Sequence, residues 1–436
     1  MQLVKSFRQF VALALFFGGL LFSAHAGFSS IYVWGDSLSA TATNGVMGTA
    51  TTNYYYGTRY SNGRTWVEVL AQRQGLVANS ITNPIWDYSS NNVSYYGHYS
   101  TSFAADLTHF NPATYPTNSL FVVWVNNADF VGDMLAGGVG EPSSQNHGGT
   151  NVANWAAVIN QHLAYHSNFI AALYAKGCRS LVAPNAADVT TIPYFNNTST
   201  AAWRAFVRQQ IVNFNSSYAA MLKQLAATQT NAGVLTICNP DIFSLLNNVL
   251  TNAASYGLTN ALFDQGNGFG PQPIDAIDAY SDGLINSAAL NGPGANYIFW
   301  DDTNPTAAME EVIADVAQQC MSPVQFSRLK QVNGSNRLDV VNMPVGLGGF
   351  VDNSTNPVPG SWTLGITNFT GLTSAQSIFI PTPPLPDGFG SGGAFGGGGG
   401  GSIDPNNPGT NAPGTNTFST ASQFYRLRFP YAWNWP

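Results

Sequence analysis

The feature that most restricts the fold of this chain is an alternation of short apolar runs with longer amphipathic segments. The apolar runs are rich in Val, Ile, Leu and aromatic residues, as buried strands are, and lie at residues 31–35, 119–125, 180–184 and 234–238. The segments between them repeat apolar residues at helical spacing and predict helices at 66–73, 152–176, 201–225 and 242–250. Strands that alternate with helices form a parallel sheet with helices on both sides. We therefore predict an α/β fold, a three-layer α/β/α sandwich around a parallel sheet.

The first apolar run ends in a turn that presents a serine. Residues 31–34 are followed at once by Gly35, Asp36 and Ser37. Gly35 lets the backbone turn without a Cβ clash. Ligands gather at the carboxyl edge of the strands in open α/β sheets, so Ser37 lies where chemistry is expected. Taken alone, Gly-Asp-Ser favours an ordinary junction between strand and loop.

Further segments, in order along the chain, give that serine a context. Residues 31–39 read IYVWGDSLS, residues 59–71 read RYSNGRTWVEVLA, and residues 300–306 read WDDTNPT. Together with the run that precedes Asn126 and Asn127, they resemble the GDSL, or SGNH, family of esterases and lipases over residues 28–320. The resemblance implies a flavodoxin-like SGNH hydrolase fold and a serine that forms an acyl-enzyme with carboxylic esters. It implies no metal and no organic cofactor.

The resemblance assigns roles to particular residues. Ser37 would be the nucleophile. The N–H groups of Ser37 and Asn92 and the side-chain amide of Asn127 would hold the carbonyl oxygen in an oxyanion hole, with Asn126 as a second choice for that amide. Two other interpretations stay open. Residues 86–93 could form a polar surface loop without a catalytic role. The side-chain amides of Asn126 and Asn127 could only cap the turn or helix that follows them.

The family's catalytic histidine is replaced in this chain. Asp301 matches the aspartate that orients the histidine, and Pro305-Thr306 match the residues that follow it, but Asn304 stands in the histidine position. An asparagine has no titratable group near neutral pH, so Asn304 cannot take the proton of Ser37. In a Ser-His-Asp triad, loss of one member leaves only the rate gain from binding and the oxyanion hole.

Two functions from different classes follow from this replacement. The first is an exported serine esterase or lipase, in which His98 or His147 replaces the missing base or Asp301 acts directly on Ser37. The second is an inactive relative that binds an ester, lipid or glycan without turnover. A third interpretation makes the C-terminal β-rich region the working part.

The N-terminus has the features of a bacterial signal peptide. Lys5 and Arg8 precede an apolar stretch at residues 10–22, and Ala24-His25-Ala26 fits a cleavage site. We expect cleavage after residue 26 and export to the periplasm, the cell surface or the medium, with an uncleaved anchor as the alternative. No later apolar run has the length of a membrane span.

The rest of the chain divides into two parts. Residues 27–321 would form the hydrolase domain. In residues 322–436, short strand-like runs separated by Gly, Pro and Asn predict a small antiparallel β domain. A Gly-, Pro- and Asn-rich stretch at residues 386–417 is typical of a flexible insertion.

The net charge restricts the possible partners, and the cysteines and histidines restrict the possible disulfides and metal sites. The net charge is −7, which argues against nucleic acid and anionic lipid headgroups and leaves a small-molecule, lipid or glycan ester as the partner. Three cysteines allow at most one disulfide, and we expect Cys178 and Cys238 to be buried free thiols. His162 and His166 have a spacing that can hold a metal, but no Glu follows His162, so a packed or surface pair is favoured.

Overall fold

The structure, a computed structural model, describes residues 28–41, 54–76, 92–109, 118–136, 150–264, 266, 270–287, 292–332, 335–354, 361–381, 424–429 and 434–435. The chain divides into two compact units. The first is Met1–Pro323 with Pro344–Gly346, and the second is Val324–Met343 with Leu347–Pro436. The predicted signal peptide, the insertion at 386–417 and His147 lie outside the described residues.

A parallel sheet of four strands forms the centre of the first unit. The strands are β1 (Ser30–Gly35), β2 (Ser119–Trp124), β3 (Ser180–Val182) and β4 (Thr236–Cys238), in that spatial order. Asn92 pairs in parallel with Val33 on the other side of β1. This bridge gives the unit the order of a flavodoxin-like sheet, in which the second segment of the chain lies outside the first. In such sheets the switch point falls between β1 and β2, so their carboxyl ends are the expected place for a site.

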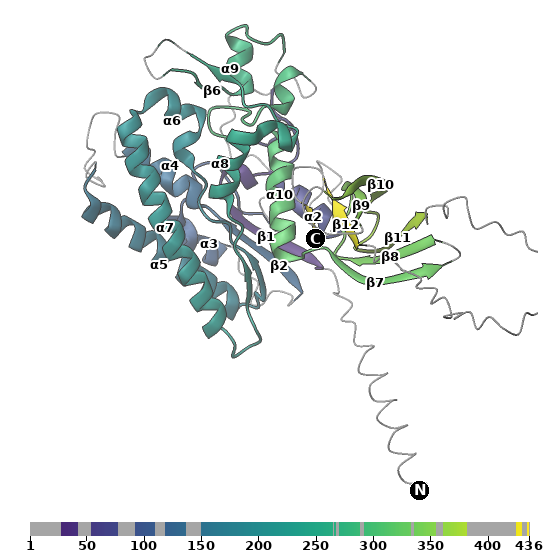
Figure 1. The fold of residues 1–436 in the computed structure, drawn as a ribbon. Coiled ribbons are helices and arrows are strands. Elements are labelled where there is room, and N and C mark those ends of the chain that lie inside the picture. The colour runs from purple at the N-terminus through teal and green to yellow at the C-terminus, as the bar shows by residue number, and fades with distance from the viewer. Residues whose placement is uncertain are drawn as a thin grey trace, which may run out of the picture. The chain divides into compact units, whose positions relative to one another are not determined.

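Helices cover both faces of this sheet (Figure 1). One face carries α2 (Trp66–Arg73) and α10 (Ala307–Met321), and the other carries α3 (Phe103–His109), α5 (Val152–Ala175) and α7 (Ala201–Thr228). The unit also contains α4 (Asn126–Ala136), α6 (Pro193–Thr198), α8 (Ile242–Asn252), α9 (Ala276–Ser281), β5 (Leu262–Phe263) and β6 (Gln272–Pro273). The predicted three-layer α/β/α fold is confirmed. In the described part of the chain, no helix combines the length and apolar character needed to cross a membrane.

Large aromatic side chains join the sheet to each helical layer. Trp34 of β1 meets Phe169 of α5 edge to face, with ring centres 5.4 Å apart. Trp124 of β2 meets Trp66 of α2 in the same way at 5.3 Å. Edge-to-face aromatic pairs of this kind contribute about 0.5–1.5 kcal/mol beyond the apolar area that they bury. The buried sheet is thereby held from both sides.

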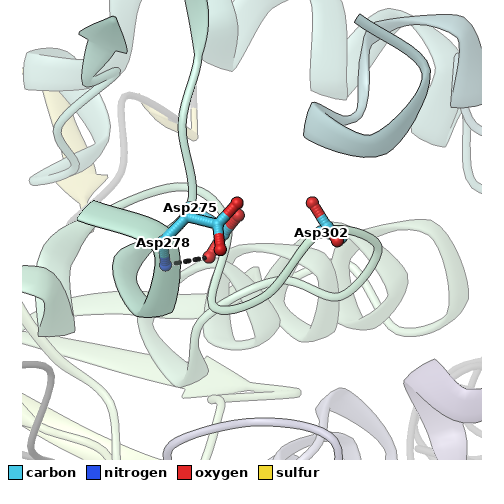
Figure 2. Close-up of side chains that lie close together, drawn as sticks. All are labelled: Asp275, Asp278 and Asp302. Atoms are coloured by element: carbon cyan, nitrogen blue, oxygen red, sulfur yellow. Dashed lines mark hydrogen bonds between the residues drawn. The ribbon is translucent and has the colours of Figure 1, made fainter. Parts of the chain in front are cut away.

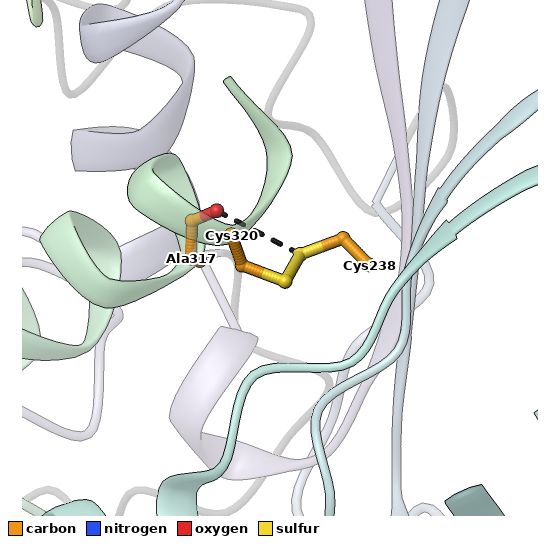
Figure 3. The surroundings of a disulfide bond; sticks show 3 residues. All are labelled: Cys238, Ala317 and Cys320. Carbon is orange, nitrogen blue, oxygen red and sulfur yellow. Dashed lines mark hydrogen bonds between the residues drawn. A yellow bond between two sulfur atoms is a disulfide. The ribbon is translucent and has the colours of Figure 1, made fainter. Parts of the chain in front are cut away.

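A disulfide joins β4 to α10 (Figure 3). Cys238 at the end of β4 is bonded to Cys320 near the end of α10, and Cys178 is a buried free thiol. The prediction for Cys178 is confirmed, whereas the prediction of a free thiol at Cys238 is wrong. The reason is tertiary: α10 returns to pack beside β4 across 82 residues of sequence, which local patterns do not reveal.

The second unit consists of two antiparallel sheets. One has the order β10 (Thr363–Thr370), β9 (Gly348–Ser354), β12 (Phe424–Arg428), β13 (Asn434–Trp435), and the other has the order β11 (Ala375–Pro381), β8 (Ser335–Val341), β7 (Gln325–Val332). Leu338, Val351, Ile378 and Leu427 belong to one buried apolar cluster to which both sheets contribute. The predicted β-rich C-terminal region is therefore confirmed as an antiparallel β unit.

Candidate active site

The chain turns sharply at the end of β1 and presents Ser37. The Asp36 carboxylate accepts the N–H of Leu38 at 3.0 Å and caps a short 3-10 helix, Ser37–Ser39. A Cβ placed on Gly35 would lie 2.5 Å from the Ser39 side chain, so only glycine allows the chain to return so closely. Ser37 is half-buried at the carboxyl edge of the sheet, next to the switch point.

Ser37, Asn304 and Asp301 form a continuous chain of hydrogen bonds. The Ser37 hydroxyl donates to Oδ1 of Asn304 at 2.7 Å, and Nδ2 of Asn304 donates to the two Asp301 oxygens at 2.9 and 3.0 Å. An ionised carboxylate only accepts hydrogen bonds, so the amide NH2 faces Asp301 and the amide oxygen faces Ser37. The three side chains thus connect a hydroxyl to a carboxylate through one amide.

Asp301 also shapes the loop that carries Asn304. Its Oδ1 accepts the N–H groups of Thr303 at 2.9 Å and Asn304 at 2.7 Å, and its Oδ2 accepts the Tyr55 hydroxyl at 2.9 Å. Burial raises the pKa of the Asp301 carboxyl, and these donors oppose that rise. Thr306 then caps α10 by accepting the N–H of Met309. The loop is thus closed by local side-chain bonds of the kind that aspartate makes in turns.

The segment at residues 59–71 supports the same loop from outside. The Ser61 hydroxyl donates to the carbonyl of Pro305 at 3.1 Å, and Oδ1 of Asn62 accepts the N–H of Ala307 at 2.7 Å. Both contacts fall within three residues of Asn304. From the sequence alone, this segment showed only a family resemblance, whereas in the structure it supports the residues that follow Asn304.

Trp66 links that segment to the serine side of the site. Its ring Nε1 donates to the Ser39 hydroxyl at 2.9 Å, and its backbone N–H donates to Oε2 of Glu310 at 3.0 Å. Glu310 is fully buried, and burial raises the pKa of its carboxyl well above the ordinary value. A single residue of α2 therefore connects the turn after Ser37 with α10.

Asn127 brings its side-chain amide to the pocket. It lies in the first turn of α4, and its Oδ1 accepts the N–H of Ala187 at 2.8 Å. Its Nδ2 is buried, the amide lowers the pKa of the neighbouring Asp36 carboxyl, and the residue lines the same pocket as Ser37. Asn126 differs, because it is fully buried away from the pocket lining and donates from Nδ2 to the Pro184 carbonyl at 3.0 Å.

Asn92 lies beside β1 rather than at the pocket. Its Nδ2 donates to the Ser39 carbonyl and the Thr41 hydroxyl, both at 2.9 Å, and Asn92 is not among the residues that line the pocket around Ser37. Gly97, five residues later and with a φ of 74°, does line that pocket. Gly97 was not among the residues predicted from the sequence, and its place in the pocket lining draws attention to it. The glycine itself, in the run YYGHY, was the available signal.

His98 is committed to structural contacts. It is fully buried, its Nδ1 lies 2.9 Å from the Gly35 carbonyl, and its Nε2 lies 2.9 Å from Oδ2 of Asp106. Both ring nitrogens therefore have partners other than Ser37. Within the described residues, the base position beside the Ser37 hydroxyl is held by Asn304.

His162 and His166 lie in a buried network on α5. Nε2 of His162 contacts Oδ2 of Asp133 at 3.1 Å, and Nδ1 contacts the Ser100 hydroxyl at 3.1 Å. Burial lowers the pKa of His162, but Asp129 and Asp133 outweigh it and raise the pKa overall, whereas burial lowers the pKa of His166. In the part of the chain that the structure describes, the pair belongs to no group of three side chains close enough to share a metal ion.

An apolar pocket of about 100 Å³ adjoins Ser37. Ser37, Asn127 and Gly97 contribute polar groups to it. Most of its lining is aliphatic and comes from α4, α8 and α10: Val131, Leu135, Ile242, Leu246, Met309 and Ile313. Asp36 also borders it, and burial raises the pKa of that carboxyl to about 7. The pocket is thus suited to an apolar group attached to a polar centre next to Ser37.

No protein-family model matches the sequence. A search of curated proteins found no match. Among solved structures, a lipase/acylhydrolase from Enterococcus faecalis is 9% identical with a TM-score of 0.25, and the match covers 56% of this chain and 87% of that one. The protein YXIM from Bacillus subtilis is 14% identical with a TM-score of 0.28, over 67% of this chain and 55% of that one. A gut microbial diltiazem-metabolizing enzyme is 10% identical with a TM-score of 0.30, over 77% of this chain and 60% of that one.

Proposed function

We propose that this protein binds carboxylic esters of apolar acids beside Ser37 and that Ser37 attacks their carbonyl carbon, at a rate limited by Asn304. The observation that carries the proposal is the chain of hydrogen bonds from the Ser37 hydroxyl through the Asn304 amide to Asp301. It has the connectivity of a hydrolase triad in every respect except the titratable ring. The adjoining aliphatic pocket supports an apolar acyl group.

The polar groups around Ser37 fit the charges of this reaction. As Oγ bonds to the carbonyl carbon, the carbonyl oxygen becomes an oxyanion and needs hydrogen-bond donors. The N–H of Ser37 starts a 3-10 turn and is not used by that turn, and the side-chain amide of Asn127 lies at the same pocket, beside Asp36. We assign the oxyanion to these two donors. The acyl-enzyme then forms as the alcohol leaves, and water returns Ser37 to its free state.

The proposed reaction lacks a side chain beside Ser37 that can accept the proton of its hydroxyl. Asn304 accepts a hydrogen bond from Ser37 but cannot hold the proton at neutral pH, and it occupies the position between Ser37 and Asp301. The proton therefore passes to solvent hydroxide, and the leaving alcohol takes its proton from water. A positioned base contributes about 10²- to 10⁴-fold to such reactions, so we expect slow turnover.

The same amide favours a second candidate function, which is binding of the ester without turnover. Hydrolysis of p-nitrophenyl esters by wild type and Ser37→Ala separates the two. A slow hydrolysis that Ser37→Ala abolishes supports the slow hydrolase. Equal rates at high protein concentration, together with retained binding of the ester, support the binding protein and remove Ser37 as a nucleophile.

We further propose that the protein is exported and works outside the cytoplasm. The apolar N-terminal segment with its Ala24-His25-Ala26 site supports export. The Cys238–Cys320 disulfide adds support, because disulfides persist in oxidising compartments. Edman sequencing of the protein recovered from culture medium or periplasm tests this, with Gly27 expected as the first residue.

A further inference from the structure

Three aspartates gather beside the loop that carries Asn304. Asp275 immediately precedes α9, Asp278 lies within α9, and Asp302 follows Asp301 in the neighbouring loop (Figure 2). Each offers one carboxylate oxygen, and the three oxygens lie within 4.8 Å of one another. The three residues line a pocket of about 390 Å³, which adjoins the apolar pocket and shares Tyr96, Val131, Leu135 and Thr303 with it.

Asp275 brings a buried carboxylate oxygen to this cluster. The residue is only 1% exposed, and its Oδ1 accepts the N–H of Asp278 at 2.9 Å. Its Oδ2 is buried, lines the pocket and accepts no hydrogen bond from an N–H group of the described residues, and the side chain that it meets is the carboxyl of Asp278. A buried carboxylate whose neighbour is a second acid carries a large desolvation cost, so a cation that satisfied both would be bound favourably.

The surroundings add no positive charge. The described residues that line this pocket include four aspartates and three tyrosines but no Lys or Arg. The cluster is therefore short of a compensating cation.

We propose that Asp275, Asp278 and Asp302 bind a divalent cation of the calcium or magnesium type. Carboxylate oxygens are hard ligands that these ions prefer, whereas zinc and copper favour nitrogen and sulfur. Three protein oxygens leave the remaining coordination positions to water. Water can reach the site because Asp302 is exposed. Partly hydrated sites in extracellular modules bind calcium with a Kd of about 10⁻⁴–10⁻³ M, and we expect this range.

The position of the cation connects it to the triad loop. The N–H groups of Ala276 and Ile277 donate to the carbonyls of Phe299 and Trp300, at 3.1 and 3.2 Å, so the start of α9 is already joined to that loop. A cation that bridges Asp275 and Asp302 would fasten the same two segments through their side chains. This inference does not depend on ester hydrolysis, because cation binding is measured directly.

Calorimetric titration of the full-length protein with CaCl2, in buffer of constant ionic strength, tests the site. Wild type should bind one calcium per chain, and calcium should raise its Tm by several degrees relative to EDTA. Asp302→Asn should weaken binding at least tenfold, and because Asp302 is exposed, this variant should keep the wild-type Tm in EDTA. Glu311→Gln, which removes a carboxylate from α10 outside the cluster, should bind calcium as wild type does.

Two results would overturn the proposal. One is the absence of saturable calcium or magnesium binding up to 10 mM, or equal binding by wild type and Asp302→Asn. The other is an equal rise of Tm with choline chloride at the same ionic strength, which would assign the pocket to organic cations or to simple screening. Asp275→Asn keeps the amide oxygen for the α9 cap, so its loss of binding with an unchanged circular dichroism spectrum would be a second confirmation.

Discussion

At the scale of single residues, the site is defined by one neutral amide and several buried acids. Asn304 links Ser37 to Asp301 by hydrogen bonds but has no group that titrates near neutral pH. Asp36, directly before Ser37, is 3% exposed, and burial raises the pKa of its carboxyl to about 7 although the N–H of Leu38 lowers it. Glu310 is shifted upward by burial as well. These acids favour their protonated forms in the folded state.

A pH dependence of stability follows from Asp36. A folded-state pKa above the unfolded value means that the folded protein holds the proton more tightly, so stability should fall as pH rises from about 4 to about 7. Urea unfolding between pH 5 and pH 7 should show a loss of about 1–3 kcal/mol that is smaller in Asp36→Asn. The isosteric asparagine keeps the oxygen that caps Leu38. Identical slopes in both proteins would show that Asp36 ionises normally.

At the scale of elements, local sequence signals predicted what local contacts form. α2 spans the predicted residues 66–73 and starts at a Thr65–Glu68 capping box, and α5 begins and ends within one residue of its prediction. Contacts between distant segments were beyond local patterns. The sequence did not reveal that Ser61 and Asn62 hold the residues after Asn304, since that contact spans more than 240 residues.

That contact predicts the effect of Asn62→Ala. The substitution removes the acceptor for the partly buried N–H of Ala307 at the start of α10, so the free energy of unfolding should fall by about 1–3 kcal/mol. The Ser37-dependent rate should fall with it, because the loop that carries Asn304 loses a support. Denaturant unfolding and ester hydrolysis measure the two effects. Asn154→Ala, at an exposed position in α5, is the matched control and should change neither.

At the scale of the whole molecule, the sequence predicted the layers, and tertiary packing decided the rest. The alternation of strands and helices predicted the α/β/α fold. The order of the motifs predicted that Ser37 and Asp301 lie in one site, and in the structure Asn304 bridges them by hydrogen bonds. The pairing of Cys238 with Cys320 was not predictable, because it depends on how α10 returns to β4. The sequence could not show that Asn92 pairs with Val33 beside β1, because that bridge joins segments far apart in the chain.

The disulfide should make a measurable contribution to stability. It joins residues 82 positions apart in the sequence. A disulfide that closes a loop of this size stabilises a folded protein by about 2–5 kcal/mol, because it restricts the unfolded chain. Cys320→Ser should therefore lower the denaturation midpoint, as dithiothreitol should in wild type. Dithiothreitol should have no further effect on Cys320→Ser. An additional loss there would place the sensitivity elsewhere than in the Cys238–Cys320 bond.

The central claim is that this is a serine-hydrolase site complete except for its base, and Asn304→His tests it most directly. We expect the variant to hydrolyse p-nitrophenyl esters about 10²- to 10⁴-fold faster than wild type near neutral pH, since an imidazole between Ser37 and Asp301 would take the serine proton. The gain should vanish in the Ser37→Ala/Asn304→His double variant. A folded Asn304→His protein that binds the ester but gains no Ser37-dependent hydrolysis would contradict the account.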